Sequence, residues 1–269
     1  MNVYKYQFEK LFYNFLILKP IKKLTSVICI HSNMFEQFIY PTKHEPQVLD
    51  QMLSIGWFRM GQSLYTTNFV TFQHRIYRTI WLRNRLKDYV HTKTYHNLRK
   101  RNANFRIELK KFAIDEAHEQ LFQTYRKAMP FQTSRSLTDL MYFFATQPGD
   151  VFNTYEINLY DQNKLIACSY FDVGHKSAEG ISSYYHPDYK NHSLGKYLIY
   201  LQIDICLENK LDFFYPGYFV PGYTHLDYKL SIGSSCLEFI DTEDLTWYDI
   251  SEYTDQGLPI ELAGIAPLI

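Results

Sequence analysis

The spacing of hydrophobic residues divides the chain into two regions. Up to residue 104 the pattern predicts only short elements, which are a helix over 48–53, strands over 63–71 and 76–82, and a helix over 92–101. Gly56 and Gly61 flank an aromatic pair, which predicts a tight turn between strands. We therefore expect residues 1–104 to form a small mixed amino-terminal domain.

From residue 105 onward the pattern is more regular. Phe105, Ile107 and Leu109 alternate with charged residues, which is typical of a half-exposed strand. The following pattern predicts, in order, a helix over 115–128, a second helix capped by Ser136, strands over 151–160, 165–173 and 180–186, a long helix over 194–208, and strands over 212–218 and 235–240.

This order of elements resembles the α+β (α/β) acyltransferase fold of GCN5-related N-acetyltransferases, in which a mixed sheet is flanked by helices. In that fold the strands before and after the long helix diverge, and the gap admits an acyl donor and an attacking amine. We expect the acyltransferase domain to span residues 105–250, followed by a carboxyl-terminal tail over 251–269.

The composition fits a globular protein of a reducing compartment. Hydrophobic residues make up 46% and charged residues 21% of the chain. The four cysteines lie far apart without a CxxC pair, which disfavours a disulfide scaffold or a zinc site. The apolar run 11–18 is too short to span a membrane and is followed by lysines. We expect a cytoplasmic protein with no membrane partner.

Aromatic content is high, with 24 Tyr and 20 Phe. Two explanations stand side by side. An AT-rich genome would favour the codons of both residues, or some of the rings stack on bases or line a pocket.

Positive charge is concentrated in one window of the chain. The net charge is zero, but residues 71–111 contain twelve basic and two acidic residues, a net charge of +10, so the other 228 residues carry −10. Such asymmetry favours a polyanionic partner, of which a phosphate backbone is the commonest. A solvated basic face is the other interpretation.

The predicted long helix lacks the phosphate-binding loop of an acetyl-CoA enzyme. That loop places a Gly or Ala two residues after its central glycine, so that backbone amides can bind the phosphates of the cofactor. Here the stretch reads His192-Ser193-Leu194-Gly195-Lys196-Tyr197. We therefore expect no coenzyme A and no other cofactor, and an acyl group that arrives on a different carrier.

Several short motifs occur in a family-specific order. They are Ser183-Tyr184-Tyr185-His186-Pro187, Ser193-Leu194-Gly195-Lys196-Tyr197, Tyr215-Pro216-Gly217-Tyr218, Tyr228-Lys229 and, upstream, Gly56-Trp57-Phe58-Arg59 and Lys100-Arg101-Asn102. Over residues 37–240 this ordered set resembles arginyl- and leucyl-tRNA–protein transferases. The resemblance implies an aminoacyltransferase that moves an amino acid from aminoacyl-tRNA to the amino-terminal amine of a protein beginning with an acidic residue. Such protein arginylation or leucylation marks the acceptor for degradation through the N-degron pathway.

The chain departs from this family at two places. The family carries paired cysteines in its amino-terminal domain, whereas here Cys29-Ile30-His31 is the only partial match. A single cysteine with a stray histidine does not make a four-ligand site, so we predict no metal. The family's basic run is also thinned here over residues 90–97.

The resemblance assigns roles to individual residues. The predicted catalytic residues are Asp172, Tyr184, Tyr185, Tyr218, Tyr228 and Lys229. The predicted substrate-binding residues are Ser193, Leu194, Gly195 and Gly217. The predicted tRNA-binding residues are Lys93, Arg99, Lys100, Arg101 and Asn102.

These roles follow from the chemistry of an activated ester. Such a donor needs no covalent nucleophile, only alignment, deprotonation of the amine and stabilisation of the oxyanion. Asp172 is expected to orient or deprotonate the incoming amine, or to hold the amino group of the donor. Lys229 is expected to contact the terminal phosphate or the oxyanion. Alternation along a strand means that only one of Tyr184 and Tyr185 can face the cleft. A solvated turn aspartate, core tyrosines and a surface lysine are the competing interpretations.

Two other functions remain open from the sequence. One is an N-acetyltransferase that uses acetyl-CoA, and the other is a noncatalytic tRNA-binding relative.

Overall fold

The fold is built around one large mixed sheet. The computed structural model describes residues 35–41, 45–72, 75–129, 134–143, 145, 149–242, 244–254 and 260–261. Eight strands follow the order β13-β12-β6-β11-β10-β9-β8-β7. Their bounds are β6 Ile80–Arg85, β7 Arg106–Lys111, β8 Thr154–Asp161, β9 Lys164–Val173, β10 Ser177–Tyr185, β11 Phe213–Phe219, β12 Leu237–Asp241 and β13 Thr246–Asp249.

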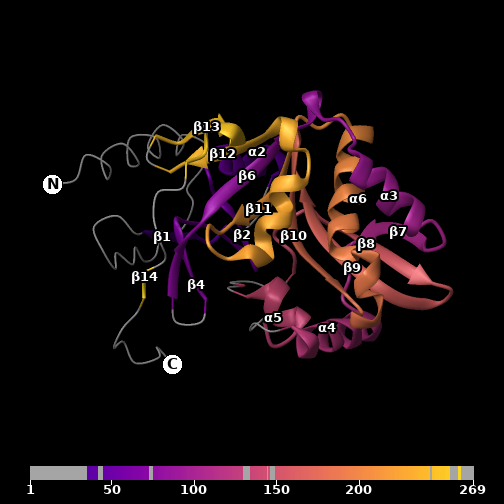
Figure 1. The fold of residues 1–269 in the computed structure, drawn as a ribbon. Coiled ribbons are helices and arrows are strands. Elements are labelled where there is room, and N and C mark those ends of the chain that lie inside the picture. Colours follow the sequence, from indigo (N-terminus) through magenta and orange to yellow (C-terminus); the bar gives the residue numbers. More distant parts are fainter. Residues whose placement is uncertain are drawn as a thin grey trace.

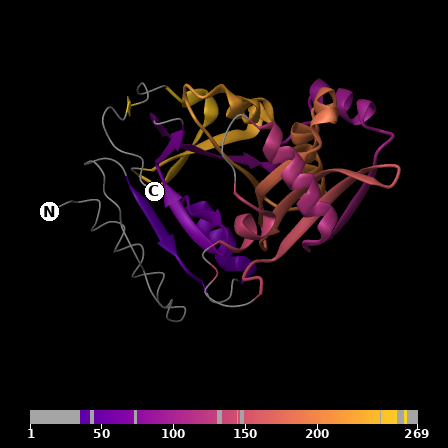
Figure 2. The same cartoon turned by 90° about the horizontal axis from the view of Figure 1, so that it is seen from below.

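Helices cover both faces of this sheet (Figures 1 and 2). The long helix α6 (Leu194–Glu208) packs on one face, with α3 (Lys93–Arg101) beside it. The helices α4 (Glu116–Ala128) and α5 (Leu137–Tyr142) pack on the other face, where they bury Phe122, Met141 and Tyr184. The prediction of a mixed sheet flanked by helices is confirmed by this topology.

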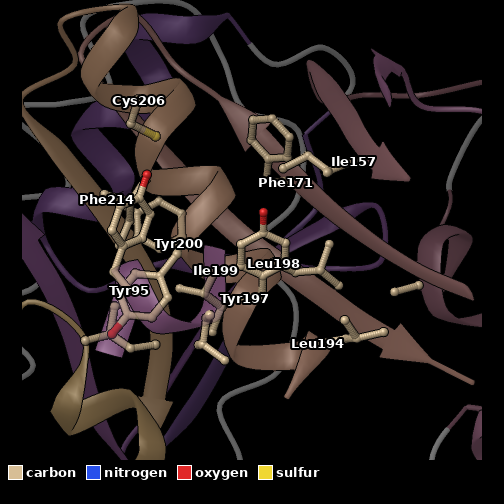
Figure 3. Packing of buried hydrophobic residues seen from close by; sticks show 14 of the residues in the cluster. Tyr95, Ile157, Phe171, Leu194, Tyr197, Leu198, Ile199, Tyr200, Cys206 and Phe214 are labelled. Carbon is tan, nitrogen blue, oxygen red and sulfur yellow. The ribbon is translucent and has the colours of Figure 1, made fainter. Parts of the chain in front are cut away.

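The largest hydrophobic core lies between α6 and the sheet. Figure 3 shows Leu194, Leu198 and Ile199 of α6 packed together with Ile157 and Phe171 of the strands. Leu198 is fully buried. Because α6 is apolar around most of its circumference, it is held between the sheet and α3 rather than lying on an open surface.

The described chain also contains two small sheets and a further α-helix. One sheet has the order β1-β3-β2, with β1 Glu36–Ile39, β2 Phe58–Met60 and β3 Ser63–Thr67. The other has the order β14-β5-β4, with β4 Phe69–Phe72, β5 Arg75–Arg78 and β14 Ile260–Glu261. Helix α2 (Pro46–Ser54) contacts β10. Phe58 stacks on Trp81 with ring centroids 3.6 Å apart and so ties β2 to the large sheet.

The regular elements agree closely with those predicted. Helix α6 has the predicted bounds, and Ser136 caps α5 by accepting a hydrogen bond from the Asp139 amide at 3.0 Å. The predicted strands over 63–71 and 76–82 are each divided. Asn68 separates β3 from β4, and Thr79 separates β5 from β6, so each predicted strand contributes to two sheets.

The large sheet draws on both sides of residue 104. Strand β6 lies between β11 and β12, although its residues precede the predicted start of the acyltransferase domain. Strand β13 was not predicted and adds an edge beside β12. Within the described stretches, none of the helices combines the length and the apolar character needed to span a bilayer.

The core beneath α6 gives a direct test of the packing. We expect Leu198→Ala to lower the free energy of unfolding by about 2–5 kcal/mol, because it removes buried methyl groups and leaves a cavity. Urea unfolding followed by circular dichroism measures this change. The matched control is Leu109→Ala on β7, where the side chain is 48% exposed and the expected change is below about 0.5 kcal/mol. Equal losses in both variants would contradict the described core.

Candidate active site

A cavity lies where two parallel strands part. Strands β10 and β11 pair only from Ser177–Phe213 to Glu179–Tyr215. Close to this last pair, the register of β10 with β9 shifts between Gly180 and Ser182, and the register of β11 with β6 shifts between Phe214 and Gly217. The space between them is about 700 Å³, a size that suits a small organic ligand or the end of a larger one.

The amino-terminal end of α6 forms one wall of this cavity. Ser193, Gly195 and Lys196 line it, whereas the side chain of Leu194 is buried in the core. Ser193 adopts the left-handed conformation (φ 51°) and gives α6 no side-chain cap. The first amides of α6 therefore receive no internal hydroxyl partner from Ser193, and the positive end of the helix dipole faces the cavity.

Tyr197 is oriented differently from the sequence-based expectation. We expected its ring to stand where a phosphate would approach. It is instead buried in the core, near Arg99 of α3, and does not line the cavity. Tyr197 therefore does not block the approach of a phosphate to this end of α6.

Only one member of the predicted tyrosine pair on β10 reaches the cavity. Tyr185 lines it and lies against Tyr125 of α4, with ring centroids 5.6 Å apart. Tyr184 points to the opposite face, where its hydroxyl is 2.7 Å from that of Tyr170 in the core. The strand alternation anticipated this split, and the structure places Tyr184 away from any substrate in the cavity.

The opposite wall comes from β11 and from η4 (Thr224–Ser231). Tyr218, Tyr228 and Lys229 all line the cavity. The Lys229 ammonium donates a hydrogen bond of 2.9 Å to the Tyr218 carbonyl, and burial lowers its pKa to about 8. Gly217 has a φ of +87°, and a Cβ there would lie 3.1 Å from Lys229 Nζ. The glycine therefore permits both the bend of β11 and the close approach of the lysine.

Asp172 is buried behind the cavity and does not line it. Its Oδ1 accepts hydrogen bonds from Arg59 Nη1 at 2.7 Å and from Thr154 Oγ1 at 2.6 Å. Both side chains of the Asp172–Arg59 ion pair are fully buried. In this structure the carboxylate is positioned to hold Arg59, and it does not reach an incoming amine in the cavity.

The structure also brings residues to the cavity that sequence reasoning did not assign. Glu179 of β10 lines it beside Arg59 of β2, Tyr65 of β3 and Trp81 of β6. Arg59 belongs to the Gly-Trp-Phe-Arg motif already noted in the sequence. Glu179 is the only charged residue of β10, which was an available signal, since a buried acid must find a partner or a cavity.

The basic helix α3 is joined to the cavity wall by hydrogen bonds. Arg101 donates to the Asn191 carbonyl at 3.0 Å, and Asn102 pairs with His192 through both its amide atoms, at 3.2 and 3.0 Å. His192 directly precedes Ser193 of the cavity. Asn102 is buried and therefore anchors this junction, rather than presenting its side chain to a ligand on the surface.

The predicted tRNA-binding cations of α3 have exposed side chains. These residues are Lys93, Arg99, Lys100 and Arg101. Arg99 also donates to the Tyr95 hydroxyl at 3.1 Å, which in turn donates to Asp204 of α6 at 2.8 Å. Positive side chains thus lie on a helix whose carboxyl end adjoins the cavity.

Metal ligands are not grouped in the described part of the chain. No three His, Cys, Asp or Glu side chains lie together there in an arrangement that would hold an ion. Cys29 and His31 lie outside the described residues. Cys168, Cys206 and Cys236 are buried free thiols.

The arrangement defines a class of protein. A long helix that directs its amino terminus into a gap between two diverging parallel strands is the architecture of the GCN5-related acyltransferases, as expected. The family follows from the sequence comparison. Residues 117–237 match the family described as "Arginine-tRNA-protein transferase, C terminus".

Two similar proteins carry one common description. An aspartate/glutamate leucyltransferase from Helicobacter hepaticus is 26% identical over 211 residues, covering 77% of this chain and 86% of the relative. An aspartate/glutamate leucyltransferase from Campylobacter jejuni is 24% identical over 200 residues, covering 72% and 80%. The predicted resemblance to aminoacyl-tRNA–protein transferases is thereby confirmed.

Among solved structures, a GCN5-related N-acetyltransferase from Kribbella flavida superposes with a TM-score of 0.35. It is 14% identical and covers 61% of this chain and 54% of its own.

The environment of Lys229 can be measured directly. We expect its ammonium to titrate near pH 8, because burial disfavours the charged form. Reductive methylation with carbon-13 followed by NMR would show this, and Lys229→Met identifies the signal by removing it. Between about pH 8 and 10.5 the unfolded chain holds this proton while the folded protein has lost it. The free energy of unfolding of the wild type, relative to Lys229→Met, should therefore rise with pH across that window. A signal that titrates at 10.5 or above would contradict the described environment.

Proposed function

We propose that this protein transfers an aminoacyl group, most simply leucine, from its tRNA to the amino-terminal α-amine of proteins that begin with Asp or Glu. The family of residues 117–237 and the leucyltransferase relatives support the reaction type. The two relatives' description as aspartate/glutamate leucyltransferases supports leucine as donor and an acidic residue in the acceptor. Marking such a chain would feed a degradation pathway that recognises amino termini.

The observation that carries this proposal is the physical continuity between α3 and the cavity. The hydrogen bonds of Arg101 and Asn102 fix the basic helix next to Ser193, where the cavity begins. A tRNA acceptor stem bound along the exposed cations of α3 would deliver its aminoacylated 3′ end to the gap between β10 and β11. Phosphate contacts of this kind position a nucleic acid without reading its sequence.

The reaction requires positioning and electrostatics rather than a covalent intermediate. The acceptor nitrogen attacks the carbonyl carbon of the ester, a C–N bond forms, and the bond to the 3′ oxygen of the tRNA breaks. The leaving oxygen takes a proton and becomes a hydroxyl. Lys229, Lys196 and the amino terminus of α6 surround the cavity with positive potential. They would stabilise the developing oxyanion and attract the acidic side chain of the acceptor.

The central test is a transfer assay with purified components. We expect label from radioactive leucyl-tRNA to appear on a peptide that begins with Asp or Glu, and not on a matched peptide that begins with Ala. Parallel reactions contain arginyl-tRNA or acetyl-CoA as the donor. Transfer from acetyl-CoA alone would replace this proposal with an N-acetyltransferase. Binding of tRNA without transfer from any aminoacyl-tRNA would replace it with a noncatalytic tRNA-binding protein.

The place of the tRNA can be tested by charge removal on α3. Replacing Arg99, Lys100 and Arg101 by Gln should weaken tRNA binding and reduce the slope of log K against log salt by about 2–3, because three phosphate contacts are lost. Filter binding over a range of salt concentrations measures this slope.

A matched control removes three exposed charges elsewhere. Replacing Lys164, Lys176 and Lys210 by Gln changes the net charge equally but leaves α3 intact. Equal slopes in both triple variants would show that the tRNA does not bind along α3.

A further inference from the structure

The cavity contains a carboxyl group, which belongs to Glu179. Among the described residues that line it, Glu179 is the sole Asp or Glu. Its side chain belongs to the last residue of β10 that pairs with β11, so it stands at the point where the strands part. The residue is 3% exposed, which is unusual for an acid without a side-chain cation.

The hydrogen bonds around Glu179 leave it partly unsatisfied. Both of its oxygens accept from a single donor, the Arg59 amide, at 3.0 and 3.3 Å. A carboxylate can accept about four hydrogen bonds, so the remaining lone pairs have room for a donor from the cavity. A substrate ammonium is the natural donor at such a position.

The guanidinium of Arg59 is committed to other partners. It donates to the Gly61 carbonyl at 2.6 Å, to the Met141 carbonyl at 3.4 Å, and to Asp172 and Thr154. Asp172 lies directly opposite Glu179 in the pairing of β9 with β10. Arg59 therefore forms an ion pair with Asp172 through its guanidinium and holds Glu179 through its backbone amide.

The charges around Glu179 set its ionisation. Burial raises the pKa of its carboxyl well above the usual range, the charge of Asp172 raises it further, and Arg59 opposes both effects. Tyr65 is electrostatically coupled to Glu179 and to Tyr218. The other titratable side chains that line the cavity are Tyr125, Tyr185, Lys196, Tyr223, His225, Tyr228 and Lys229. A carboxylate in such surroundings is a stronger base than one in water.

We propose that Glu179 is the catalytic base that accepts a proton from the α-ammonium of the acceptor, and that Arg59 and Asp172 are the residues that position it. This inference rests on the proposed function. The acceptor ammonium gives one proton to the Glu179 carboxylate, which becomes neutral, and the free amine attacks the ester carbonyl. The second proton passes from the nitrogen to the departing 3′ oxygen, and Glu179 returns its proton to solvent. Asp172, which was expected to act on the amine directly, instead fixes Arg59.

The test is the pH dependence of transfer by Glu179→Gln. The substituted amide oxygen can still accept from the Arg59 amide, so the local fold has a substitute partner. We expect kcat/KM to fall by about 100-fold or more at pH 7, the range of a lost general base. The loss should shrink above about pH 8, where the α-amine of the acceptor is already neutral in solution. Affinity for tRNA should stay unchanged in filter binding.

Controls separate a chemical role from a structural one. Glu208→Gln removes an exposed carboxylate at the end of α6 and should match the wild type at every pH. If Glu179→Gln does not fold, Glu179→Asp takes its place. It should transfer more slowly while keeping the pH dependence of the wild type.

The outcomes that would overturn the inference are distinct from those against the function. A Glu179→Gln enzyme that is fully active, or that loses the same factor at every pH, shows that Glu179 is not the base. Wild-type protein that transfers no aminoacyl group at any pH instead refutes the proposed function itself.

Discussion

The molecule depends on the early separation of two parallel strands. Strands β10 and β11 share only three residue pairs before bulges on both strands turn them apart. Each bulge releases backbone groups from the ladder and opens room that side chains alone would have filled. The cavity, the exposed end of α6 and the approach of η4 all follow from this separation. Continuous pairing along both strands would leave a closed sheet without a place for an ester and an amine to meet.

The buried pair of Arg59 and Asp172 connects the amino-terminal part of the chain with the acyltransferase sheet. Arg59 comes from β2 of a small sheet, whereas Asp172 comes from β9 of the large one. Removal of one partner would leave a buried charge unpaired, which costs far more than the pair itself contributes. The backbone amide of the same Arg59 holds Glu179 where it lines the cavity. The two parts of the chain therefore build the site together.

A second connection joins the basic helix to the cavity. The carboxyl end of α3 is bonded to residues 191 and 192, directly before the turn that begins α6. Cations at the end of a helix also complement its dipole, so Arg99, Lys100 and Arg101 suit this helix whether or not a nucleic acid is present. Their exposure and their place beside the cavity favour an additional role in binding the phosphates of a donor.

Local pattern was sufficient for most elements of the fold. The long helix over 194–208, the cap at Ser136 and the strands β8, β9 and β10 were all predictable, because periodicity and capping act between near neighbours. Order of motifs also identified the family. The insertion of β6 between β11 and β12, by contrast, pairs residues more than a hundred positions apart and leaves no local signal.

The site residues, too, were only partly predictable from the local sequence. Strand alternation allowed only one of Tyr184 and Tyr185 to face the cleft. The tertiary structure shows which one, because Tyr184 is buried in the core beneath α4 and α5 and Tyr185 lines the cavity. Asp172 and Glu179 are both acids on core strands, and nothing in their local sequence distinguishes them. Arg59, more than a hundred residues away, pairs with one and leaves the other facing the cavity. Residue types and their spacing along the chain thus fixed the family and the elements. The roles of individual acids and tyrosines were set by long-range contacts, since burial and charge pairing depend on neighbours in space rather than in sequence.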